Sequence, residues 1–279
     1  MTAAEDEIAV ELEAIQVGYP AGVGRVVRAG ERAMGLVDRR VLVGPIDPCG
    51  ECDVCRRGGA AVCPAATRRT SLDAGVVVAG RWAVPLDDGL EIPGPAAAAV
   101  AGDVALAYTL YARAGVGPRD PVVVVGGSPV SRFLIEILLA KAIAPVAVAE
   151  PGPWADWLRG KGVSVARDEA AVREELAAQS LGTRPWRLLC GDPPAAVAAL
   201  ELAGPRATLT LLAGTAPQPI AGAALTREVS IVGVAGAHPD LVVEAAALCV
   251  RGEIDLASGT TQSAADAMKT QVRPIRQAR

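Results

Sequence analysis

The sequence predicts an α/β protein with a small β unit near its start and a doubly wound parallel sheet in the remainder. Two observations carry this prediction. After residue 121, short apolar runs typical of strands buried on both faces alternate with helical stretches. Before residue 95, apolar and polar residues alternate as in half-buried strands, and a cysteine-rich segment interrupts them.

The composition suits a folded chain and excludes some partners. Of the 279 residues, 51% are hydrophobic, which is enough to build a core. The net charge is -4 and no basic cluster exceeds a few residues, so we expect no nucleic-acid partner. The acidic start lacks the features of a secretory signal, and no apolar stretch of membrane-spanning length is free of a charge, Pro or Gly. We therefore expect a cytoplasmic protein without a membrane partner.

The first domain is expected to span residues 1–112. An Ala-rich helical stretch from residue 95 to 115 leads out of it. The polar end of the chain, 257–279, either returns to this domain or is poorly ordered. Strands are expected at 7–17, within 18–30, at 41–44 and at 75–85.

The second domain is expected to span residues 113–256. Its alternation of strands and helices is the signature of a doubly wound parallel sheet. Strands are expected at 122–125, 146–149, 163–166, 187–190, 208–214 and 228–236, and helices at 132–142, 154–162, 193–203 and 239–251.

Four cysteines are spaced C-x2-C-x2-C-x7-C between residues 49 and 63. Four thiolates on a short, glycine-containing loop can surround one ion tetrahedrally at about 2.3 Å per bond, as in a closed structural zinc site. Free buried thiols and an iron–sulfur cluster are the alternatives, and we favour zinc because all four cysteines share one compact lobe. The expected ligands are Cys49, Cys52, Cys55 and Cys63, whereas the isolated Cys190 and Cys249 are expected to be packing residues.

A dinucleotide site is indicated between the strand at 122–125 and the helix that follows it. A Rossmann-type fold places a G-x-G-x-x-G turn there, with the helix N-terminus facing a pyrophosphate. Glu150, 24 residues after the first glycine, ends the next strand, where an acid accepts hydrogen bonds from a ribose. No Arg follows it, which favours NAD(H) over NADP(H); the alternative is a solvated strand-end acid. The turn consists of Gly126, Gly127, Ser128, Pro129, Val130 and Ser131, with Ser128 and Ser131 in the second and third glycine positions.

Together these segments resemble the medium-chain zinc-containing alcohol dehydrogenases. The lobe sequence PCGECDVCRRG, the strand GVGRVVRAG and the segment AGVGPRDPVVVVGG carry the resemblance, which covers most of the chain. It implies a Rossmann-type doubly wound parallel sheet plus a truncated GroES-like β domain that carries a structural zinc lobe. It also implies an oxidoreductase that uses NAD(H).

The resemblance ends at the catalytic zinc of that family. The positions that match its ligands are Tyr19-Pro20-Ala21 and Gly102, and the loop with the first Cys ligand is missing, so we expect no catalytic metal. The single histidine, His238, is expected to be structural or solvated. Hydride transfer then requires only a bound nicotinamide and a proton donor. The candidate donors are Tyr19, Asp103 and Tyr108.

Two functions remain open at this point. The first is a zinc-independent oxidoreductase acting on an unidentified small molecule. The second is a catalytically inactive relative, a pseudoenzyme, that serves as a partner subunit or nucleotide sensor; a truncated chain without its own function is a third reading. In each case the apolar strand at 228–236 favours a homodimer or a partner protein, because an exposed apolar edge aggregates unless paired.

Overall fold

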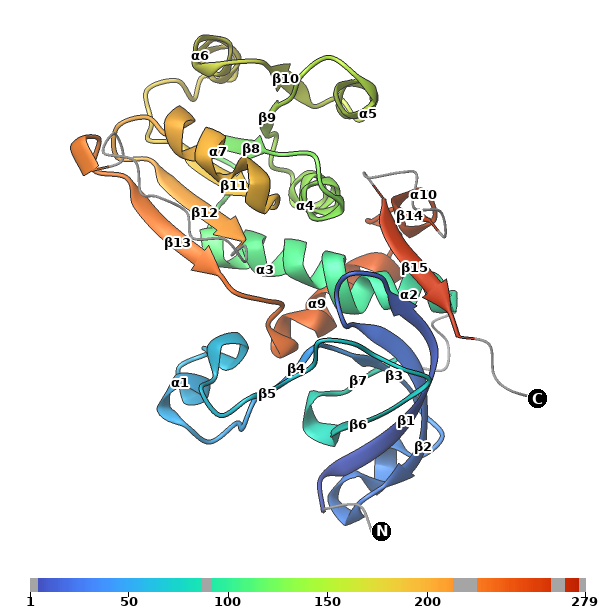
Figure 1. Cartoon of the computed structure of the whole chain (residues 1–279). Helices are drawn as coiled ribbons and strands as arrows, with labels where there is room; N and C mark the ends of the chain where they lie inside the picture. Colours follow the sequence, from blue (N-terminus) through green and yellow to red (C-terminus); the bar gives the residue numbers. More distant parts are fainter. Residues whose placement is uncertain (1–4, 87–91, 213–224, 262–268, 276–279) are drawn as a thin grey trace. The chain divides into compact units, whose positions relative to one another are not determined.

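The computed structural model describes residues 5–86, 92–212, 225–261 and 269–275 (Figure 1). The chain divides into two compact units, residues 1–106 with 237–279 and residues 107–236. The sequence placed the domain boundaries at 112 and 256 instead. The difference arises because helix α9 (Pro239–Val250) packs against the helical turn η4 (Val100–Val104) of the first unit.

The first unit is built around a mixed sheet in the order β14-β15-β1-β2-β3-β7, with β6 also paired to β1. Along β1, every second side chain points into the core, so that Ile8, Val10 and Leu12 are fully covered. This alternation is what the sequence pattern predicts for a strand with one buried face. The strands are β1 (Glu7–Gln16), β2 (Gly22–Ala29), β3 (Arg40–Val43), β6 (Gly75–Ala79), β7 (Val84–Leu86), β14 (Thr260–Thr261) and β15 (Thr270–Pro274).

The expected strand at 75–85 is wrong in one respect, since it is two strands separated by the 3-10 turn η3 (Gly80–Trp82). The backbone amide of Gly80 donates to the carbonyl of Asp6 at 2.6 Å. A Cβ at Gly80 would lie 2.8 Å from the Cβ of Ala33, so only glycine allows this close approach. The turn lets β6 pair with β1 while β7 pairs with β3.

A continuous helical stretch leaves this sheet. It consists of α2 (Gly94–Ala99), the π-helical turn η4 and α3 (Ala105–Ala114). Among the described residues, this is the one helical segment long and apolar enough to cross a membrane by length and composition. Of its most apolar window, 83% is buried inside the protein, as in the core helix of a globular chain.

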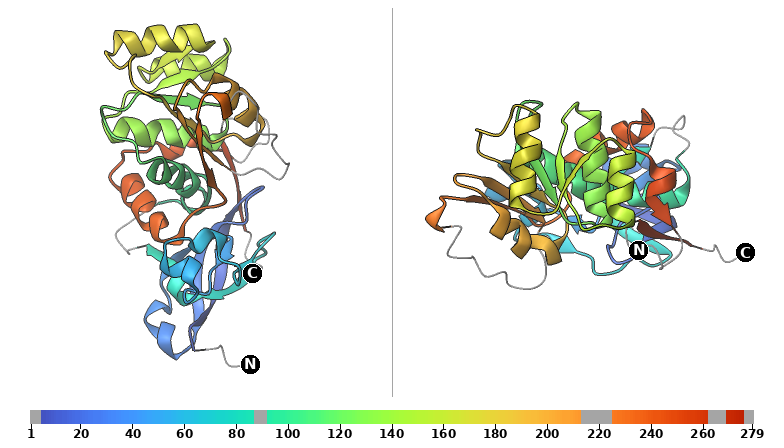
Figure 2. Two further views of the ribbon diagram at one scale, coloured as in Figure 1. Left: turned by 90° about the vertical axis from the view of Figure 1, so that its left-hand side faces the viewer. Right: turned by 90° about the horizontal axis from the view of Figure 1, so that it is seen from above.

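The second unit contains six parallel strands in the order β10-β9-β8-β11-β12-β13, covered by helices on both faces (Figure 2). Numbered along the chain, this order is 3-2-1-4-5-6, the Rossmann arrangement. The expected doubly wound sheet is therefore confirmed. The elements are β8 (Val122–Val125), α4 (Pro129–Ala140), β9 (Val146–Val148), α5 (Pro153–Gly160), β10 (Ser164–Ala166), α6 (Glu169–Ala178), β11 (Arg187–Cys190), η5 (Pro193–Ala195), α7 (Ala196–Leu202), β12 (Thr208–Leu212) and β13 (Ser230–Val234).

Helix α6 was missed from the sequence. Only Val172 and Leu176 of this helix are buried, so its apolar stripe is thin. The signal that marks it is its N-cap, since the Asp168 carboxylate accepts from the amide of Ala171 at 2.9 Å. The last two residues of the expected strand at 208–214 lie outside the described residues.

The described part of the chain end returns to the first unit. Strand β15 pairs antiparallel with β1, and Ile15 lies opposite Arg273. Helix α10 (Leu256–Gly259) precedes the short strand β14, which runs parallel to β15. Residues 262–268 and 276–279 of the expected terminal segment lie outside the described residues.

Candidate functional site

The cysteine lobe is a small structure of its own. It contains the two-stranded sheet of β4 (Ile46–Asp47) and β5 (Thr67–Arg68), the helical turn α1 (Asp53–Arg56) and the 3-10 turn η2 (Ala60–Val62). The indole N–H of Trp82 donates to the carbonyl of Pro48 at 2.7 Å and attaches the lobe to the rest of the unit.

The four Sγ atoms of Cys49, Cys52, Cys55 and Cys63 all lie within 4.8 Å of one another. Three of the separations are 3.6 Å, 3.9 Å and 4.0 Å. A tetrahedron with metal–sulfur bonds of about 2.3 Å has edges of about 3.8 Å. The geometry of the cluster therefore fits one zinc ion, with no vertex left for a substrate.

Backbone amides prepare these sulfurs for a cation. The amide of Cys49 donates to the sulfur of Cys63, and the amide of Cys55 donates to the sulfur of Cys52, each at 3.5 Å. Backbone hydrogen bonds from Glu51 and then Cys52 lower the pKa of the Cys49 thiol to about 6, whereas burial raises the pKa of the Cys55 thiol to about 12. A thiol with a lowered pKa is largely a thiolate at neutral pH, the form that binds a metal.

The glycine-rich turn of the second unit joins β8 to α4. Gly126 has a φ of +103°, and a Cβ there would lie 2.5 Å from the Cβ of Asp192. Both facts require glycine. Asp192 follows β11, so the turns after β8 and β11 meet where the strand order reverses. Ligands of doubly wound sheets bind at this switch point.

The two serines that replace glycines are accommodated by this neighbouring turn. Ser128 is the N-cap of α4: its hydroxyl accepts from the amide of Ser131 at 3.3 Å and donates to the carbonyl of Gly191 at 2.9 Å. A Cβ at Gly191 would lie 3.2 Å from the hydroxyl oxygen of the fully buried Ser131. Ser131 stands where the motif has its third glycine, and the glycine at 191 provides the space that the serine side chain needs. The sequence analysis did not connect Gly191 with the site.

Glu150, shortly after β9, and Trp154, in the first turn of α5, complete this region. The carboxylate of Glu150 is exposed just after the strand, as expected of a ribose-binding acid. Trp154, which the sequence analysis did not single out, lies against Gly127: a Cβ there would be 3.3 Å from its Cδ1 atom. Val130 is buried in the first turn of α4.

At Gly102, the position matched above to the third ligand of a catalytic zinc, the neighbouring space is occupied by a side chain. A Cβ at Gly102 would lie 1.8 Å from Oε1 of Gln16. Nε2 of Gln16 donates to the carboxylate of Asp103 at 2.8 Å, and the amide of Asp103 donates back to Oε1 at 3.1 Å. In the described part of the chain, the four lobe cysteines are the only group of His, Cys, Asp or Glu side chains close enough to hold a metal.

The three candidate proton donors have different surroundings. Asp103 is buried, accepts a further hydrogen bond from the hydroxyl of Thr270 at 2.7 Å, and has its pKa raised by burial. The Tyr19 hydroxyl accepts from the amide of Ala237 at 3.3 Å, and burial raises the pKa of Tyr19 to about 12. Tyr108 belongs to the second unit, where its buried ring lies 5.7 Å from that of Tyr111.

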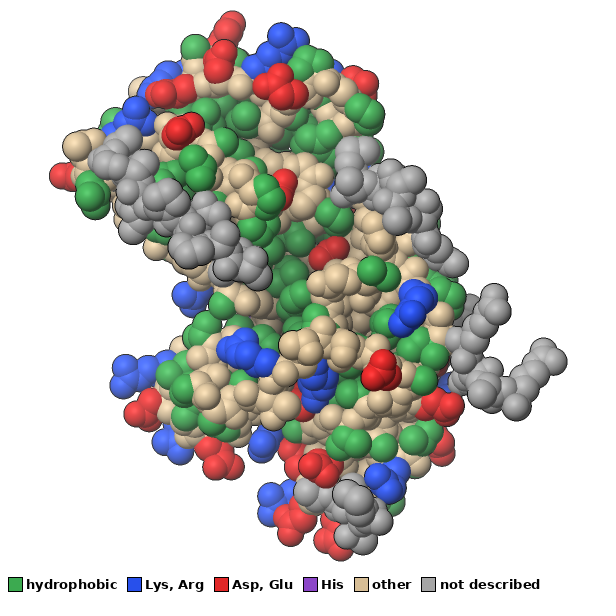
Figure 3. Space-filling view, in the orientation of Figure 1, with side chains coloured by type: hydrophobic (Ala, Val, Ile, Leu, Met, Phe, Trp, Pro, Cys, Tyr) green, Lys and Arg blue, Asp and Glu red, His purple; other side chains and the backbone are tan. Residues whose placement is uncertain are grey.

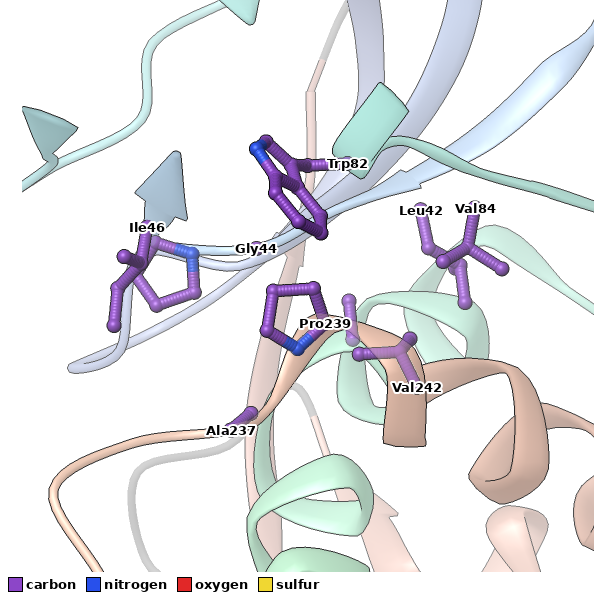
Figure 4. A pocket seen from close by; sticks show the side chains of 10 residues that line it. Leu42, Gly44, Ile46, Trp82, Val84, Ala237, Pro239 and Val242 are labelled. Atoms are coloured by element: carbon purple, nitrogen blue, oxygen red, sulfur yellow. The ribbon is translucent and has the colours of Figure 1, made fainter. Parts of the chain in front are cut away.

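Tyr19 differs from Asp103 in its access to solvent. It lines an open depression of about 500 Å³ in the first unit, together with residues 15–18, 70–73 and Arg273. A second cavity of this unit, between Trp82, Val84 and Val242, measures only about 20 Å³ (Figure 4). That is room for about one water molecule, so the second cavity holds no substrate.

His238 is the N-cap residue of α9, and its Nδ1 lies 3.5 Å from the Asp240 carboxylate. Cys190 and Cys249 are buried packing residues. On the face drawn in Figure 3, Lys and Arg side chains are interspersed with Asp and Glu rather than gathered in a basic surface.

Comparison with solved structures decides the fold. A short chain alcohol dehydrogenase of Escherichia coli CFT073 complexed with NADH matches with a TM-score of 0.80 at 15% identity, over 99% of this chain and 94% of that one. This chain has the alcohol dehydrogenase fold. The expected Rossmann-type sheet with a GroES-like β domain is thereby confirmed. Neither a protein-family model nor a curated protein sequence matches the chain.

Two further dehydrogenase structures share the alcohol dehydrogenase fold with this chain. Galactitol-1-phosphate dehydrogenase of Escherichia coli matches with a TM-score of 0.76 at 17% identity, over 94% of this chain and 86% of that one. A Sinorhizobium meliloti 1021 protein described as a zinc-binding dehydrogenase, bound to NADP, matches with a TM-score of 0.76 at 16% identity. The match covers 98% of this chain and 93% of the Sinorhizobium meliloti protein.

Proposed function

We propose that this protein is an NAD(H)-dependent oxidoreductase of the alcohol dehydrogenase type whose zinc is structural only. The observation that carries the proposal is the 3-2-1-4-5-6 strand order with a glycine turn at its switch point. That combination places a helix N-terminus, the backbone amides of the turn and an acid after the second strand around one crevice, which suits a dinucleotide.

The residues of the second unit fit the nucleotide. The N-terminus of α4 and the amides that follow Gly126 face the position of a pyrophosphate, and the exposed carboxylate of Glu150 accepts from ribose hydroxyls. When bound, the nicotinamide gives or takes a hydride. The remaining task of the chain is to hold the substrate and supply or accept a proton.

Tyr19 is the donor that we retain among the three candidates. Asp103 is already engaged by Gln16 and Thr270, and Tyr108 is packed in the core. Because the pKa of Tyr19 is raised to about 12, its hydroxyl keeps its proton throughout the physiological range. Such a protonated hydroxyl can act as a general acid toward an alkoxide, whose pKa is higher still.

The lobe supplies stability in this proposal. Four sulfurs within 4.8 Å leave no open coordination position, so the zinc cannot polarise a substrate. Binding of the metal is coupled to folding of the lobe. Beyond this, we propose a homodimer that pairs through β13, the terminal strand of the parallel sheet. We also propose a cytoplasmic location, which is consistent with six cysteines that form no disulfide.

A catalytically inactive relative is the second candidate. It is favoured by one specific observation, the Gln16 side chain that fills the space beside Gly102 where the family holds a metal ligand. Under this alternative the chain binds a nucleotide or a partner without turnover. It shares the zinc lobe and the nucleotide crevice with the first candidate, so the two differ only in turnover.

Titration calorimetry with NADH tests the proposal. We expect binding to the wild type, and Glu150→Ala to weaken it by about 1.5–3 kcal/mol, the range for hydrogen bonds to a charged group, or roughly tenfold to a hundredfold. Glu174→Ala, which removes an exposed acid from α6, is the matched control and should bind as the wild type does. Absence of NADH binding at millimolar ligand refutes the proposal. A panel of alcohols and carbonyl compounds, followed at the nicotinamide absorbance, then separates the enzyme from its inactive alternative.

A further inference from the structure

We propose that Trp154 is a ligand-contacting residue of the nucleotide site, with its indole N–H as a hydrogen-bond donor to a phosphate oxygen of the dinucleotide. The inference rests on the proposed nucleotide function and adds to it a contact that no glycine motif predicts. It names the phosphate, rather than the adenosine, as the group that Trp154 recognises.

The position of the indole is the first argument. A Cβ at Gly127 would lie 3.3 Å from Cδ1, 3.5 Å from Cγ and 3.6 Å from Nε1 of Trp154, so the face of the pyrrole ring lies over the turn. Gly127 is the second residue of the turn whose amides face a pyrophosphate. Any side chain at position 127 would meet the ring, so Nε1 of Trp154 lies beside the turn where the pyrophosphate is expected.

The unpaired donor is the second argument. Nε1 of Trp154 is buried and has no hydrogen-bond partner among the described residues. Leaving a buried donor unpaired is costly, and buried indole N–H groups usually find a partner. A phosphate oxygen is an acceptor of the right kind, because hydrogen bonds to charged acceptors are shorter and stronger than neutral ones.

The third argument is that the ring is held in place. The ring of Trp157 stacks on that of Trp154 with centroids 5.1 Å apart and an interplanar angle of 10°. The guanidinium of the buried Arg132 lies over the ring of Trp157, 4.6 Å from the ring centroid. Arg132 belongs to α4, the helix that begins at the glycine turn, so the indole and the turn are fixed to the same element.

The experiment compares Trp154→Phe with Trp186→Phe by titration calorimetry with NADH, ADP and adenosine. Phe keeps an aromatic ring and removes the N–H. Trp186 precedes β11 and therefore lies at the opposite ends of the parallel strands, within the same core. We expect Trp154→Phe to weaken the binding of NADH and of ADP roughly tenfold or more and to leave the affinity for adenosine unchanged. Trp186→Phe should change none of the three affinities. Quenching of tryptophan fluorescence by ADP should also be smaller in Trp154→Phe.

Each other outcome overturns the inference in an identifiable way. If wild-type and Trp154→Phe proteins bind NADH equally, Trp154 is no donor, while the proposed function stands. If Trp154→Phe weakens the binding of adenosine as much as that of ADP, the indole contacts the nucleoside and not the phosphate. Tighter binding by Trp154→Phe means that the indole occupies the place of the ligand. If the wild type binds no NADH, the proposed function fails and the inference fails with it. Circular dichroism of each variant establishes that the fold is kept.

Discussion

Gly102 and Gln16 offer the sharpest test of the reasoning about the missing catalytic metal. A Cβ at position 102 would lie 1.8 Å from Oε1 and 2.7 Å from Cδ of Gln16. Neither separation is possible, so Gly102→Ala must expel the Gln16 side chain from its place. Both hydrogen bonds between Gln16 and Asp103 are then broken in a buried setting.

The magnitude follows from the groups left unpaired. Each buried donor or acceptor without a partner costs about 1–3 kcal/mol. Alanine is favoured over glycine in a helix by about 1 kcal/mol, which offsets part of the loss. We therefore expect Gly102→Ala to lower the free energy of unfolding by about 1–5 kcal/mol. Gly94→Ala is the control in the same helical stretch, because a Cβ there has no neighbour closer than 3.7 Å.

A double-mutant cycle separates this steric argument from a general sensitivity of the helix. Once Gln16 is replaced by Ala, the space beside Gly102 is free, and Gly102→Ala should cost nothing further. The coupling energy of the two substitutions should therefore equal the cost of Gly102→Ala in the wild type, about 1–5 kcal/mol. Urea unfolding of the zinc-saturated protein, followed by circular dichroism, measures this. With a slope of about 2 kcal/mol per molar urea, a change of 2 kcal/mol moves the midpoint by about 1 M.

If the effects of the two substitutions on the free energy of unfolding simply add, the reasoning is refuted. The same holds if Gly102→Ala is as stable as Gly94→Ala, since the Gln16 side chain would then not occupy the third-ligand position. Gly102→Cys in the wild-type background should destabilise the protein in the same way, because its Cβ meets the Gln16 side chain at the same place.

Three further predictions concern the lobe, the buried acid and the sheet edge. Cys63→Ser should reduce bound zinc below half an equivalent by metal analysis, whereas Cys249→Ser keeps one equivalent; iron in place of zinc would contradict the assignment. Burial raises the pKa of Asp103, so the folded state holds this proton more tightly than the unfolded chain does. The stability that this provides is fully present below the unfolded pKa of about 4 and is lost as the pH rises through the folded pKa. Asp103→Asn, which is neutral at every pH, should therefore lose less stability than the wild type between pH 4 and pH 8 in urea titrations, and an equal or larger loss counts against the buried proton. Ile231→Lys on the exposed face of β13 should convert the dimer to a monomer in light scattering, while Val243→Lys on α9 should not; a monomeric wild type excludes the dimer.

Several features were predictable from the sequence because they depend on local spacing. The cysteine cluster is held within 15 residues, so its spacing alone limits how far apart the sulfurs can lie. The strands and helices of the second unit follow from runs such as VVVV and from the periodicity of the helices between them. Helix α6 was missed because its polar sequence offers only two buried side chains, although the Asp168 N-cap marks its start.

Other features required the tertiary structure because they join residues far apart in the chain. Gln16, which fills the space beside Gly102, is hydrogen-bonded to Asp103 across 87 residues, and Gly191 makes room for Ser131 from the neighbouring strand end. The membership of α9 in the first unit is likewise a matter of packing, since its sequence reads as the next helix of the parallel sheet.

The sequence by itself thus determined the cysteine cluster and the strand-and-helix alternation, since each depends on which residues stand within a few positions of one another. The tertiary structure alone decided what occupies the vacated positions: an amide beside Gly102, a hydroxyl packed on Gly191 and an indole against Gly127. The physical reason is that a side chain fills space according to its neighbours in the fold. Those neighbours are brought together by strand order and crossovers, which local periodicity does not specify.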